Sequence, residues 1–507
     1  MKLLAPFEFA GRAADRLRAA MTGENRERVV FLSLVVYVVL WALYGFIAKA
    51  SQGLHYDMTE TIAWSRDPAW GYLKHPPAAA AAAWLWFGIF PLNEFSFYAL
   101  AMTMPALALW IVWRIAGDYL PPDRRVAALA LTMLVPFFNF HALKFNVNTV
   151  MIPLWAATTL FFLRSVTRRS MLHAALAGVA AALAMMGKYW SVFLLAGLIV
   201  AVLCDPRRLL YFRSPLPWIT AAAGLVALSP HLYWLWQNDF APFGYAIYIH
   251  GAKPFAATFI AALGYVAGSL AYVAVPVVLV LLAARPNRAA FADMMWPSDP
   301  DRRLAAAAFW APFILPAFGA IASGIEITSL WSMPAWTLLT VLLLSSPHVA
   351  WRAIDTQRVT MAAIALPVVM LVASPMIAIM AQRAGPRPAS SQAAILAQQV
   401  EREWYLTTPY PLLFVGGDEE IAYDVIAYAI DRPRALPNMP APDADELRRR
   451  GMVLLCFAED AACKAASAAR AGSAPGSVTI ESTVVRNFWR FPGKPQRYTI
   501  TILPPAR

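Results

Sequence analysis

A polar segment with acidic and basic side chains follows the first long apolar run of the chain. Asp57 and Glu60 are three positions apart, so a helix would place both carboxylates on one face. A partly desolvated carboxylate can act as general base on a hydroxyl group, because burial raises its pKa toward the working pH. Lys74 and His75 follow on the same segment and suit the negative charge of a phosphate leaving group.

The alternative for this segment is structural. Asp57 and Glu60 would then form a solvated helix face that pairs with Arg66. An arbitrary loop with these residues favours that alternative.

More polar side chains stand where later apolar runs end. Lys188 could neutralise a phosphate, although a lysine there can also simply extend its charged end to the membrane interface. His231 is either a binding residue or a structural histidine. Trp234 lies where aromatic side chains commonly mark the membrane interface, and sugar stacking is the sharper alternative. The other candidates of this group are Lys144, Asn146, Asn148, Tyr189, Asp239, His250, Lys253 and Glu326.

All of these residues fall on one side of a membrane when the topology is assigned from the positive charges of the loops. The Arg-rich connections, among them residues 114–125 and 207–213, are assigned to the cytoplasm because short cytoplasmic loops carry excess Lys and Arg. We predict about eleven spans, each near the ~20 residues that a bilayer core requires. They are residues 29–48, 95–116, 126–140, 149–164, 171–187, 190–204, 216–235, 257–284, 305–322, 329–346 and 359–381.

The apolar segment 76–90 is short. If it crossed the membrane, every later Arg-rich loop would lie outside, so we predict that it enters from the outer face without crossing. The first span, 29–48, is too long for a cleaved signal peptide and is interpreted as a retained signal anchor.

Composition supports a membrane protein. The chain has 507 residues, of which 60% are hydrophobic and 14% charged, a profile that excludes an ordinary soluble domain over the first three quarters. The net charge of +12 would suggest nucleic-acid binding in a soluble protein. Here topology and anionic lipid headgroups account for it, so no nucleic-acid partner is expected.

The character of the chain changes after residue 382. A Pro- and Ser-containing stretch, 385–392, is typical of a linker. Short apolar runs then alternate with helical patterns, which predicts a small α/β domain. The predicted strands are residues 412–415, 453–457, 478–485 and 498–503. The acidic run Asp418–Glu420 is interpreted as a solvated turn.

The chain has three cysteines. Cys204 ends a span and is interpreted as inert. Cys456 and Cys463 lie in the C-terminal region, which the predicted topology places in an oxidising compartment, and they form either a disulfide or two reduced thiols. There is no CxxC, no His/Cys cluster with zinc spacing and no cofactor signature, so no cofactor or metal site is predicted.

The motifs, in their order along the chain, resemble the polyprenyl-phosphate-dependent glycosyltransferases of the GT-C superfamily. These include the protein O-mannosyltransferases, the aminoarabinose transferases that modify lipid A, and rhizobial-type galacturonosyltransferases. An acidic residue after the first span precedes Gly-Tyr-Leu-Lys-His-Pro-Pro at residues 71–77. Lys-Phe-Asn-Val-Asn at 144–148, Gly-Lys-Tyr at 187–189 and the segment 229–239 follow. Together they cover about half of the chain.

This resemblance implies specific roles. Asp57 would deprotonate an acceptor hydroxyl, and the sugar would leave a polyprenyl phosphate with inversion at its anomeric carbon. Lys74 and His75 would lie near the donor phosphate. Two departures matter: Met58 stands where the family commonly has a second acid, and Asn146 or Asn148 replaces an acid in the next outer loop. An asparagine cannot act as a base and is a poor metal ligand, so a metal-dependent mechanism is less well supported and Asp57 carries more of the chemistry.

The fold expected from sequence is therefore an all-α polytopic membrane protein of GT-C type, with outer-face juxtamembrane helices and a small soluble α/β domain. Predicted domains are a basic cytoplasmic segment (1–28), a transmembrane glycosyltransferase domain (29–381) and a periplasmic domain (382–507). The donor would be a polyprenyl-phosphate sugar and the acceptor a glycan, lipid or protein of a bacterial inner membrane or cell envelope, such as lipid A. The alternatives are a transporter or lipid flippase, which would place ionisable groups at mid-span, and an inactive scaffold.

Overall fold

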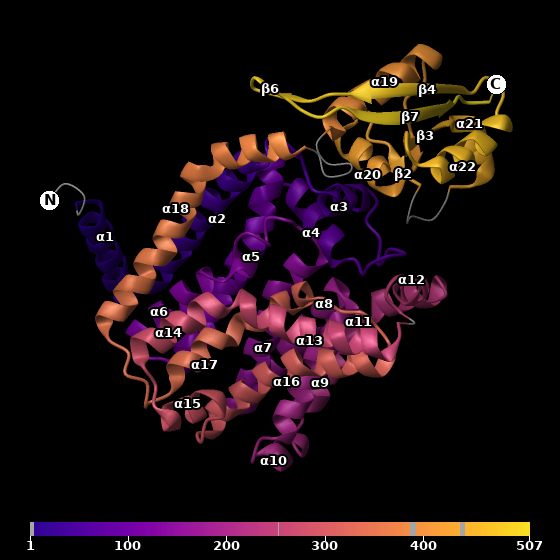
Figure 1. Ribbon diagram of the computed structural model, residues 1–507. Helices are drawn as coiled ribbons and strands as arrows, with labels where there is room; N and C mark the ends of the chain where they lie inside the picture. The colour runs from indigo at the N-terminus through magenta and orange to yellow at the C-terminus, as the bar shows by residue number, and fades with distance from the viewer. Residues whose placement is uncertain (1–4, 252, 386–391, 437–441, 507) are drawn as a thin grey trace. The chain divides into compact units, whose positions relative to one another are not determined.

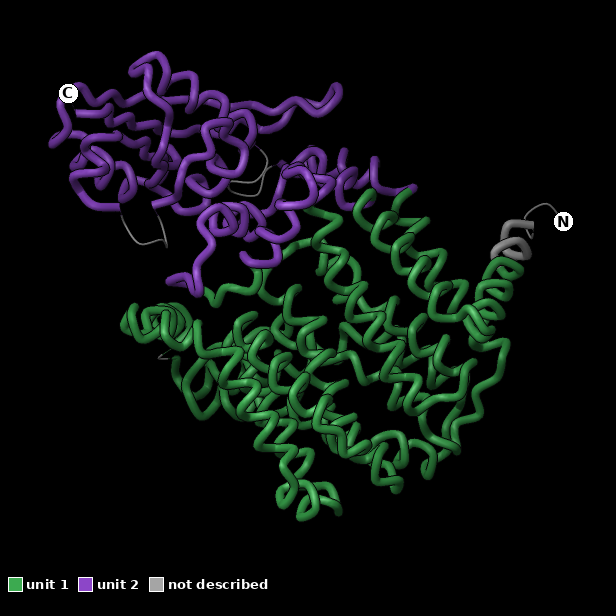
Figure 2. Tube along the Cα trace, turned by 180° about the vertical axis from the view of Figure 1, so that it is seen from behind, with its two compact units in different colours: residues 1–43, 75–79, 97–371 green, residues 44–74, 80–96, 372–507 purple. Residues whose placement is uncertain are grey.

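The computed structural model describes residues 5–251, 253–385, 392–436 and 442–506. The chain forms two compact units (Figure 2). The first comprises residues 1–43, 75–79 and 97–371, and the second comprises residues 44–74, 80–96 and 372–507. The predicted boundary at residue 382 rests on the change in sequence composition there. In the structure, residues 44–74 and 80–96 pack with the C-terminal region.

Helices account for nearly all regular structure before residue 385 (Figure 1). In chain order they are α1 (Ala5–Thr22), α2 (Arg26–Ala48), α3 (Tyr56–Arg66), α4 (Ala78–Phe87), α5 (Glu94–Tyr119), α6 (Pro122–Met133), η1 (Pro136–Phe138), α7 (Val147–Thr167), α8 (Met171–Gly187), η2 (Tyr189–Ser191), α9 (Val192–Leu203), α10 (Arg208–Phe212), α11 (Leu216–Gln237), α12 (Ala241–His250), α13 (Phe255–Tyr272), α14 (Ala274–Ala284), α15 (Arg288–Met295), α16 (Pro300–Ser323), η3 (Ser329–Leu338), α17 (Leu339–Ser345) and α18 (Ala353–Ala384).

Six helices of the described chain are long and apolar enough to cross a membrane: α2, α5, α7, α13, α16 and α18. This confirms a multi-pass membrane protein, while the count of about eleven spans stays a prediction. Helix α4 has only 10 residues, so it is about 15 Å long, half of the ~30 Å hydrocarbon core. Its length agrees with the prediction that residues 76–90 do not cross.

Prolines shorten or divide three of the predicted spans. The predicted span 126–140 ends as an α-helix at Met133, and Pro136 begins a separate 3₁₀ turn. The predicted span 257–284 is divided at Val273 into α13 and α14, with Pro276 in the first turn of α14. The predicted span 329–346 forms the 3₁₀ helix η3, which contains Pro334, followed by the short α17. Proline lacks the N–H that an α-helix interior requires, so each of these prolines removes one helical hydrogen bond from its predicted span.

Small residues let the helices of the first unit approach closely. A Cβ atom on Gly178 of α8 would lie 2.2 Å from the carbonyl oxygen of Thr220 on α11. Gly197 of α9 similarly faces Pro312 on α16, and a Cβ atom on this glycine would lie 2.4 Å from the nearest carbon of the proline ring. Membrane helices commonly pack through such small residues, because packing and not hydrophobic burial drives their association.

The C-terminal part of the second unit is the predicted α/β fold. Its elements are α19 (Ala393–Thr407), β1 (Phe414–Gly417), α20 (Glu419–Tyr428), β2 (Arg434–Ala435), α21 (Ala444–Arg450), β3 (Met452–Phe457), α22 (Ala461–Gly472), β4 (Val478–Val484), β5 (Asn487–Phe488), β6 (Phe491–Pro492) and β7 (Gln496–Leu503). The four predicted strands correspond to β1, β3, β4 and β7, whereas β2 and the β5–β6 hairpin were not predicted. Most of the predicted linker, residues 386–391, lies outside the described residues.

The sheet is five-stranded, with the order β2-β1-β3-β7-β4. Strands β2, β1 and β3 run parallel, and β7 is antiparallel to both β3 and β4. Cys456 at the end of β3 and Cys463 on α22 form a disulfide. Of the two alternatives left open by the sequence, the structure therefore has the bonded one.

Helix α3 belongs to the core of this second unit. Trp64 of α3 is buried in one apolar cluster with Trp404 of α19 and Tyr423 of α20. Figure 1 shows α3 beside α20. The segment that carries Asp57 and Glu60 is thus held by the C-terminal α/β fold, although more than 300 residues separate them in sequence.

Candidate functional site

Asp57 lies in the first turn of α3, where the helix is capped by the preceding residue. The Nδ1 atom of His55 accepts a hydrogen bond of 3.1 Å from the Asp57 backbone N–H. The same Nδ1 atom is 3.7 Å from Oδ1 of Asp57, whose side chain is 22% exposed. The positive end of the helix dipole favours a carboxylate at this position. Asp57 is therefore an accessible carboxylate with a histidine next to it.

Glu60 lies one turn further along α3 and is in a different environment. Its side chain is only 5% exposed, and its Oε1 atom is 2.8 Å from Nζ of Lys74. Lys74 also reaches Oε1 of Glu419 at 3.2 Å and donates a short hydrogen bond to the hydroxyl of Tyr56. That hydroxyl is in turn 2.7 Å from Glu419 and 3.2 Å from Glu60. We call Tyr56, Glu60, Lys74 and Glu419 the Lys74 cluster.

Burial governs the proton affinities in the Lys74 cluster. It raises the pKa of Glu60 to about 7, against the opposing effect of the Lys74 ammonium and with further raising by Asp57 and Glu419. Burial also raises the pKa of the Tyr56 hydroxyl, so this group keeps its proton at neutral pH. Asp57 and Glu60 thus share a helix but not an environment, and Glu60 already has a cation as its partner.

Helix α20 supplies Glu419, so the interpretation of residues 418–420 as a solvated turn is wrong. Asp418 is the N-cap of α20 and accepts a hydrogen bond from the Ile421 N–H. Residues 418–420 are all partly buried, and this burial raises the pKa of Asp418 and of Glu420. No local sequence signal predicts this, because the partners of Glu419 are Tyr56 and Lys74, which are 363 and 345 positions away.

A second polar contact joins α3 to α20. The Thr59 hydroxyl donates a 3.0 Å hydrogen bond to Oδ1 of Asp424, which is 1% exposed. Burial raises the pKa of Asp424 well above its ordinary value. The Arg66 guanidinium donates to the carbonyl of Ile426 at 2.7 Å. Arg66 therefore bonds to α20, whereas the structural alternative paired it with Asp57 and Glu60.

Other predicted residues gather in the first unit. Nζ of Lys188 is 3.1 Å from Oδ1 of Asn148 and 4.1 Å from the ring centre of Trp331. The ring of His250 meets the Trp331 ring edge-on, with the two centres 5.2 Å apart. Burial and the nearby Lys188 charge lower the pKa of His250, so this histidine is mostly neutral near pH 7. Trp331, in η3, was not predicted as a site residue.

Asn146 and Lys144 lie just before α7. The side-chain oxygen of Asn146 caps this helix by accepting the N–H groups of Asn148 and Thr149 at 2.9 and 3.2 Å. The backbone carbonyl of Lys144 accepts the Thr149 hydroxyl at 3.0 Å. The side-chain oxygen of Asn146 is thus used to cap α7, whereas Asn148 contacts Lys188 directly.

Tyr189, His231 and Trp234 form an aromatic group, also in the first unit. The Tyr189 hydroxyl is 3.1 Å from Nε2 of His231, and the His231 and Trp234 rings stack with their centres 6.1 Å apart. His231 is 1% exposed, while Tyr189 and Trp234 are half-buried. His75, next to Lys74 in the chain, is half-buried as well.

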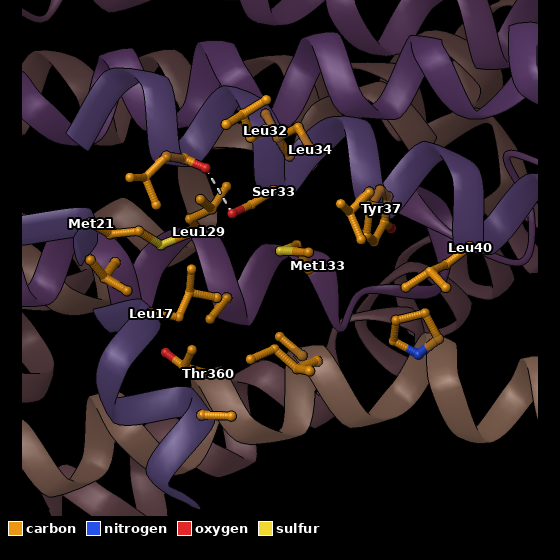
Figure 3. Close-up of a pocket in the computed structure, with 18 residues that line it drawn as sticks. Leu17, Met21, Leu32, Ser33, Leu34, Tyr37, Leu40, Leu129, Met133 and Thr360 are labelled. Atoms are coloured by element: carbon orange, nitrogen blue, oxygen red, sulfur yellow. Dashed lines mark hydrogen bonds between the residues drawn. The ribbon is translucent and has the colours of Figure 1, made fainter. Parts of the chain in front are cut away.

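An apolar cavity of about 460 Å³ lies elsewhere in the first unit (Figure 3). Segments of α1, α2, α6 and α18 line it, and its polar lining residues are Ser33, Tyr37 and Thr360. Among the described residues that line it, none is an Asp, Glu, His, Lys or Arg. The chemistry therefore belongs to the residues described above and not to this cavity. In the described part of the chain, no three His, Cys, Asp or Glu side chains are grouped so as to hold a metal ion.

Residues 74–234 match the family described as dolichyl-phosphate-mannose-protein mannosyltransferase. The chain is 29% identical over 233 residues to the lipopolysaccharide core galacturonosyltransferase RgtB of Rhizobium johnstonii. The aligned part is 44% of this chain and 45% of that protein, so less than half of this curated relative is matched.

Two solved structures of ArnT from Cupriavidus metallidurans resemble nearly the whole chain. The structure bound to undecaprenyl phosphate has a TM-score of 0.62 at 13% identity and covers 94% of this chain and 98% of that chain. The apo structure has a TM-score of 0.58 at 12% identity, covering 93% and 97%. The chain has the GT-C fold. The predicted GT-C resemblance is thereby confirmed. The family match runs from Lys74 to Trp234, and these two residues are also the first and the last of the predicted binding residues.

Proposed function

We propose that this GT-C protein is an inverting glycosyltransferase that moves a sugar from a polyprenyl phosphate to a hydroxyl group of a periplasmic or outer-leaflet acceptor. The observation that carries this proposal is the contrast between two carboxylates on α3. Glu60 is buried against Lys74, whereas Asp57 is partly exposed in the first helical turn. The likeness to a fold that has been solved with undecaprenyl phosphate supports a lipid-phosphate donor.

Asp57 is the proposed general base. It takes the proton of the acceptor hydroxyl while that oxygen attacks the anomeric carbon of the sugar. The bond between this carbon and the phosphate oxygen breaks, and the polyprenyl phosphate leaves with both electrons of that bond. Attack from the face opposite the leaving group inverts the anomeric carbon. A positioned base of this kind typically contributes about 10²–10⁴-fold in rate.

Lys74, His75 and Lys188 are proposed to bind the donor phosphate. Charge develops on the phosphate oxygen as the sugar leaves, and preorganised cations stabilise it most when water is excluded. Burial and, to a smaller extent, the Lys188 charge lower the pKa of His250. A phosphate bound at Lys188 would offset the Lys188 contribution to this shift.

Lys144, Asn146, Asn148, Tyr189, His231 and Trp234 are proposed to bind the substrates. An indole face held by stacking, as in the Trp234–His231 pair, suits the apolar face of a sugar ring. Asn148 can hydrogen-bond sugar hydroxyl groups through its amide. These side chains are proposed to orient the reactants, whereas Asp57 is proposed to be the base.

The protein is proposed to lie in a bacterial inner membrane with its N-terminus in the cytoplasm. The C-terminal α/β fold would then be periplasmic, where the Cys456–Cys463 disulfide is chemically stable. Glycan, lipid and protein acceptors all remain within this proposal, and so do pentose, hexose and uronic acid donors, because each offers the same reacting groups.

Mass spectrometry of envelope lipids and glycans tests the proposal. A deletion strain is complemented with the wild-type chain, with Asp57→Asn or with Asp67→Asn. Asp67 is a matched control, since it is the C-cap residue of the same helix and pairs with Arg434 on the surface. One sugar mass should disappear on deletion, return with wild type and Asp67→Asn, and stay absent with Asp57→Asn. Full restoration by Asp57→Asn would instead favour transport or a scaffold role.

A further inference from the structure

The ammonium of Lys74 has a full set of acceptors within the second unit. An ammonium group offers three N–H donors. Lys74 directs them to Glu60 at 2.8 Å, to Glu419 at 3.2 Å and to the Tyr56 hydroxyl. A phosphate oxygen that binds this ammonium therefore competes with these acceptors.

The position of Glu419 is set by how α20 packs on α3. Asp418 caps α20 and fixes where the helix begins. Further along α20, buried Asp424 accepts the Thr59 hydroxyl of α3. The rings of Tyr56 and Tyr423 are also in contact, with centres 6.2 Å apart. The first residue of α20 consequently projects its carboxylate to Lys74 from a sequence distance of 345 residues.

The two carboxylates at Lys74 differ in how easily they can be replaced. Glu60 has the shorter contact and is 5% exposed, whereas Glu419 has the longer contact and is 36% exposed. An ion pair with a partly exposed carboxylate is easier to separate than a buried one, because water solvates the carboxylate that is released. A phosphate offers several strong acceptor oxygens to the same cation. Glu419 is thus the acceptor that an incoming phosphate displaces.

We propose that Glu419 holds Lys74 in place before the donor binds, and that the polyprenyl phosphate displaces Glu419 from the Lys74 ammonium when it binds. This inference rests on the proposed function, and it gives the C-terminal fold a role: α20 sets the affinity for the lipid donor. When another group occupies the site, the apparent dissociation constant of a ligand equals its intrinsic value divided by the fraction of protein whose site is free. For an ion pair of this exposure the resulting increase is about two- to fivefold.

Binding of undecaprenyl phosphate alone tests this without any transfer reaction. The purified full-length protein in lipid nanodiscs is titrated as wild type, Glu419→Gln and Glu420→Gln, and thermal melting checks that each is folded. Glu420→Gln removes the same charge one residue further along α20. Glu419→Gln should lower the Kd by about two- to fivefold, whereas Glu420→Gln should change it much less. In transfer assays the change should fall on the KM for the donor and not on kcat.

A double-mutant comparison separates displacement from general electrostatics. In a Lys74→Met background, Glu419→Gln should no longer alter the Kd, because the cation through which it acts is gone. A Kd that is unchanged or raised by Glu419→Gln, in a protein that still transfers sugar, would overturn the inference and leave the proposed function standing. A wild-type protein that binds no undecaprenyl phosphate and transfers no sugar would instead overturn the proposed function.

Discussion

Replacing Glu60 by Gln should make the stability of the protein less sensitive to pH. Glu60 is buried beside Lys74, and burial raises its pKa to about 7, with Asp57 and Glu419 adding to that effect. In the unfolded chain the same group titrates near its ordinary value of 4.5. Because the folded-state pKa is the higher one, the stabilisation by Glu60 is complete below about pH 4.5 and is lost as the pH rises through about 7.

The size of the effect follows from the two pKa values. A difference of one pKa unit corresponds to about 1.4 kcal/mol, so the interval from 4.5 to about 7 corresponds to about 3 kcal/mol. Most of this, roughly 2–3 kcal/mol, is lost between about pH 5 and about pH 8. Glutamine has nearly the same shape and no ionisable proton. The stability of Glu60→Gln relative to wild type should therefore improve by about that amount across this range.

Hydrogen exchange of α3 in lipid nanodiscs measures this locally, since protection reports the free energy of opening. Wild type, Glu60→Gln and Asp67→Asn are compared at several pH values between about 5 and 8. Asp67 pairs with Arg434 and is 37% exposed, so its replacement should shift all protection by a small, nearly constant amount. Parallel pH profiles for wild type and Glu60→Gln would refute the reasoning, because they would mean that Glu60 keeps an ordinary pKa in the folded protein.

Two further predictions concern packing and topology. Gly178→Ala should destabilise the packing of α8 on α11 by about 1–3 kcal/mol, because the added Cβ would lie 2.2 Å from a backbone oxygen. The control is Gly264→Ala on α13, where an added Cβ has no heavy atom within 4 Å. Equal melting temperatures for the two variants would contradict the packing argument. Cysteines introduced in place of Trp70 and Tyr245 should react with an impermeant reagent from outside intact spheroplasts, whereas one in place of Leu120 should not. Labelling of residue 120 from outside would mean that residues 76–90 cross the membrane.

Apolar run length predicted the position of most helices well. The run 171–187 coincides with α8, and the run 29–48 differs from α2 only by the first turn. The structure ends or divides other predicted spans near Pro136 and Pro276, and Pro334 lies inside the 3₁₀ helix η3. Prolines at 153, 230 and 312 lie inside helices. Proline alone therefore does not predict where a helix breaks, because membrane helices tolerate proline where neighbouring groups satisfy the freed backbone atoms.

The candidate site was predicted only in part, for a different physical reason. Local spacing was enough to find Asp57 and Glu60 on one helix with Lys74 nearby. It could not show that Tyr56 and Glu419 meet, because these residues are 363 positions apart and come together through the packing of α20 on α3. Nor could it separate the roles of Asp57 and Glu60, since their difference is one of burial. The roles proposed for Lys74, His75, Lys188 and the substrate-binding residues stay predictions.

The central claim is that Asp57 is the base, and transfer by purified protein tests it most directly. A polyprenyl-phosphate sugar, with the sugar named by the envelope analysis, is incubated with its acceptor and with wild type, Asp57→Asn or Asp67→Asn in nanodiscs, and the transferred sugar is counted. Binding of undecaprenyl phosphate is measured on the same samples. We predict that Asp57→Asn lowers the transfer rate by about 10²–10⁴-fold while phosphate binding and melting stay close to wild type. A rate for Asp57→Asn within a few-fold of the Asp67→Asn rate would show that Asp57 is not the base.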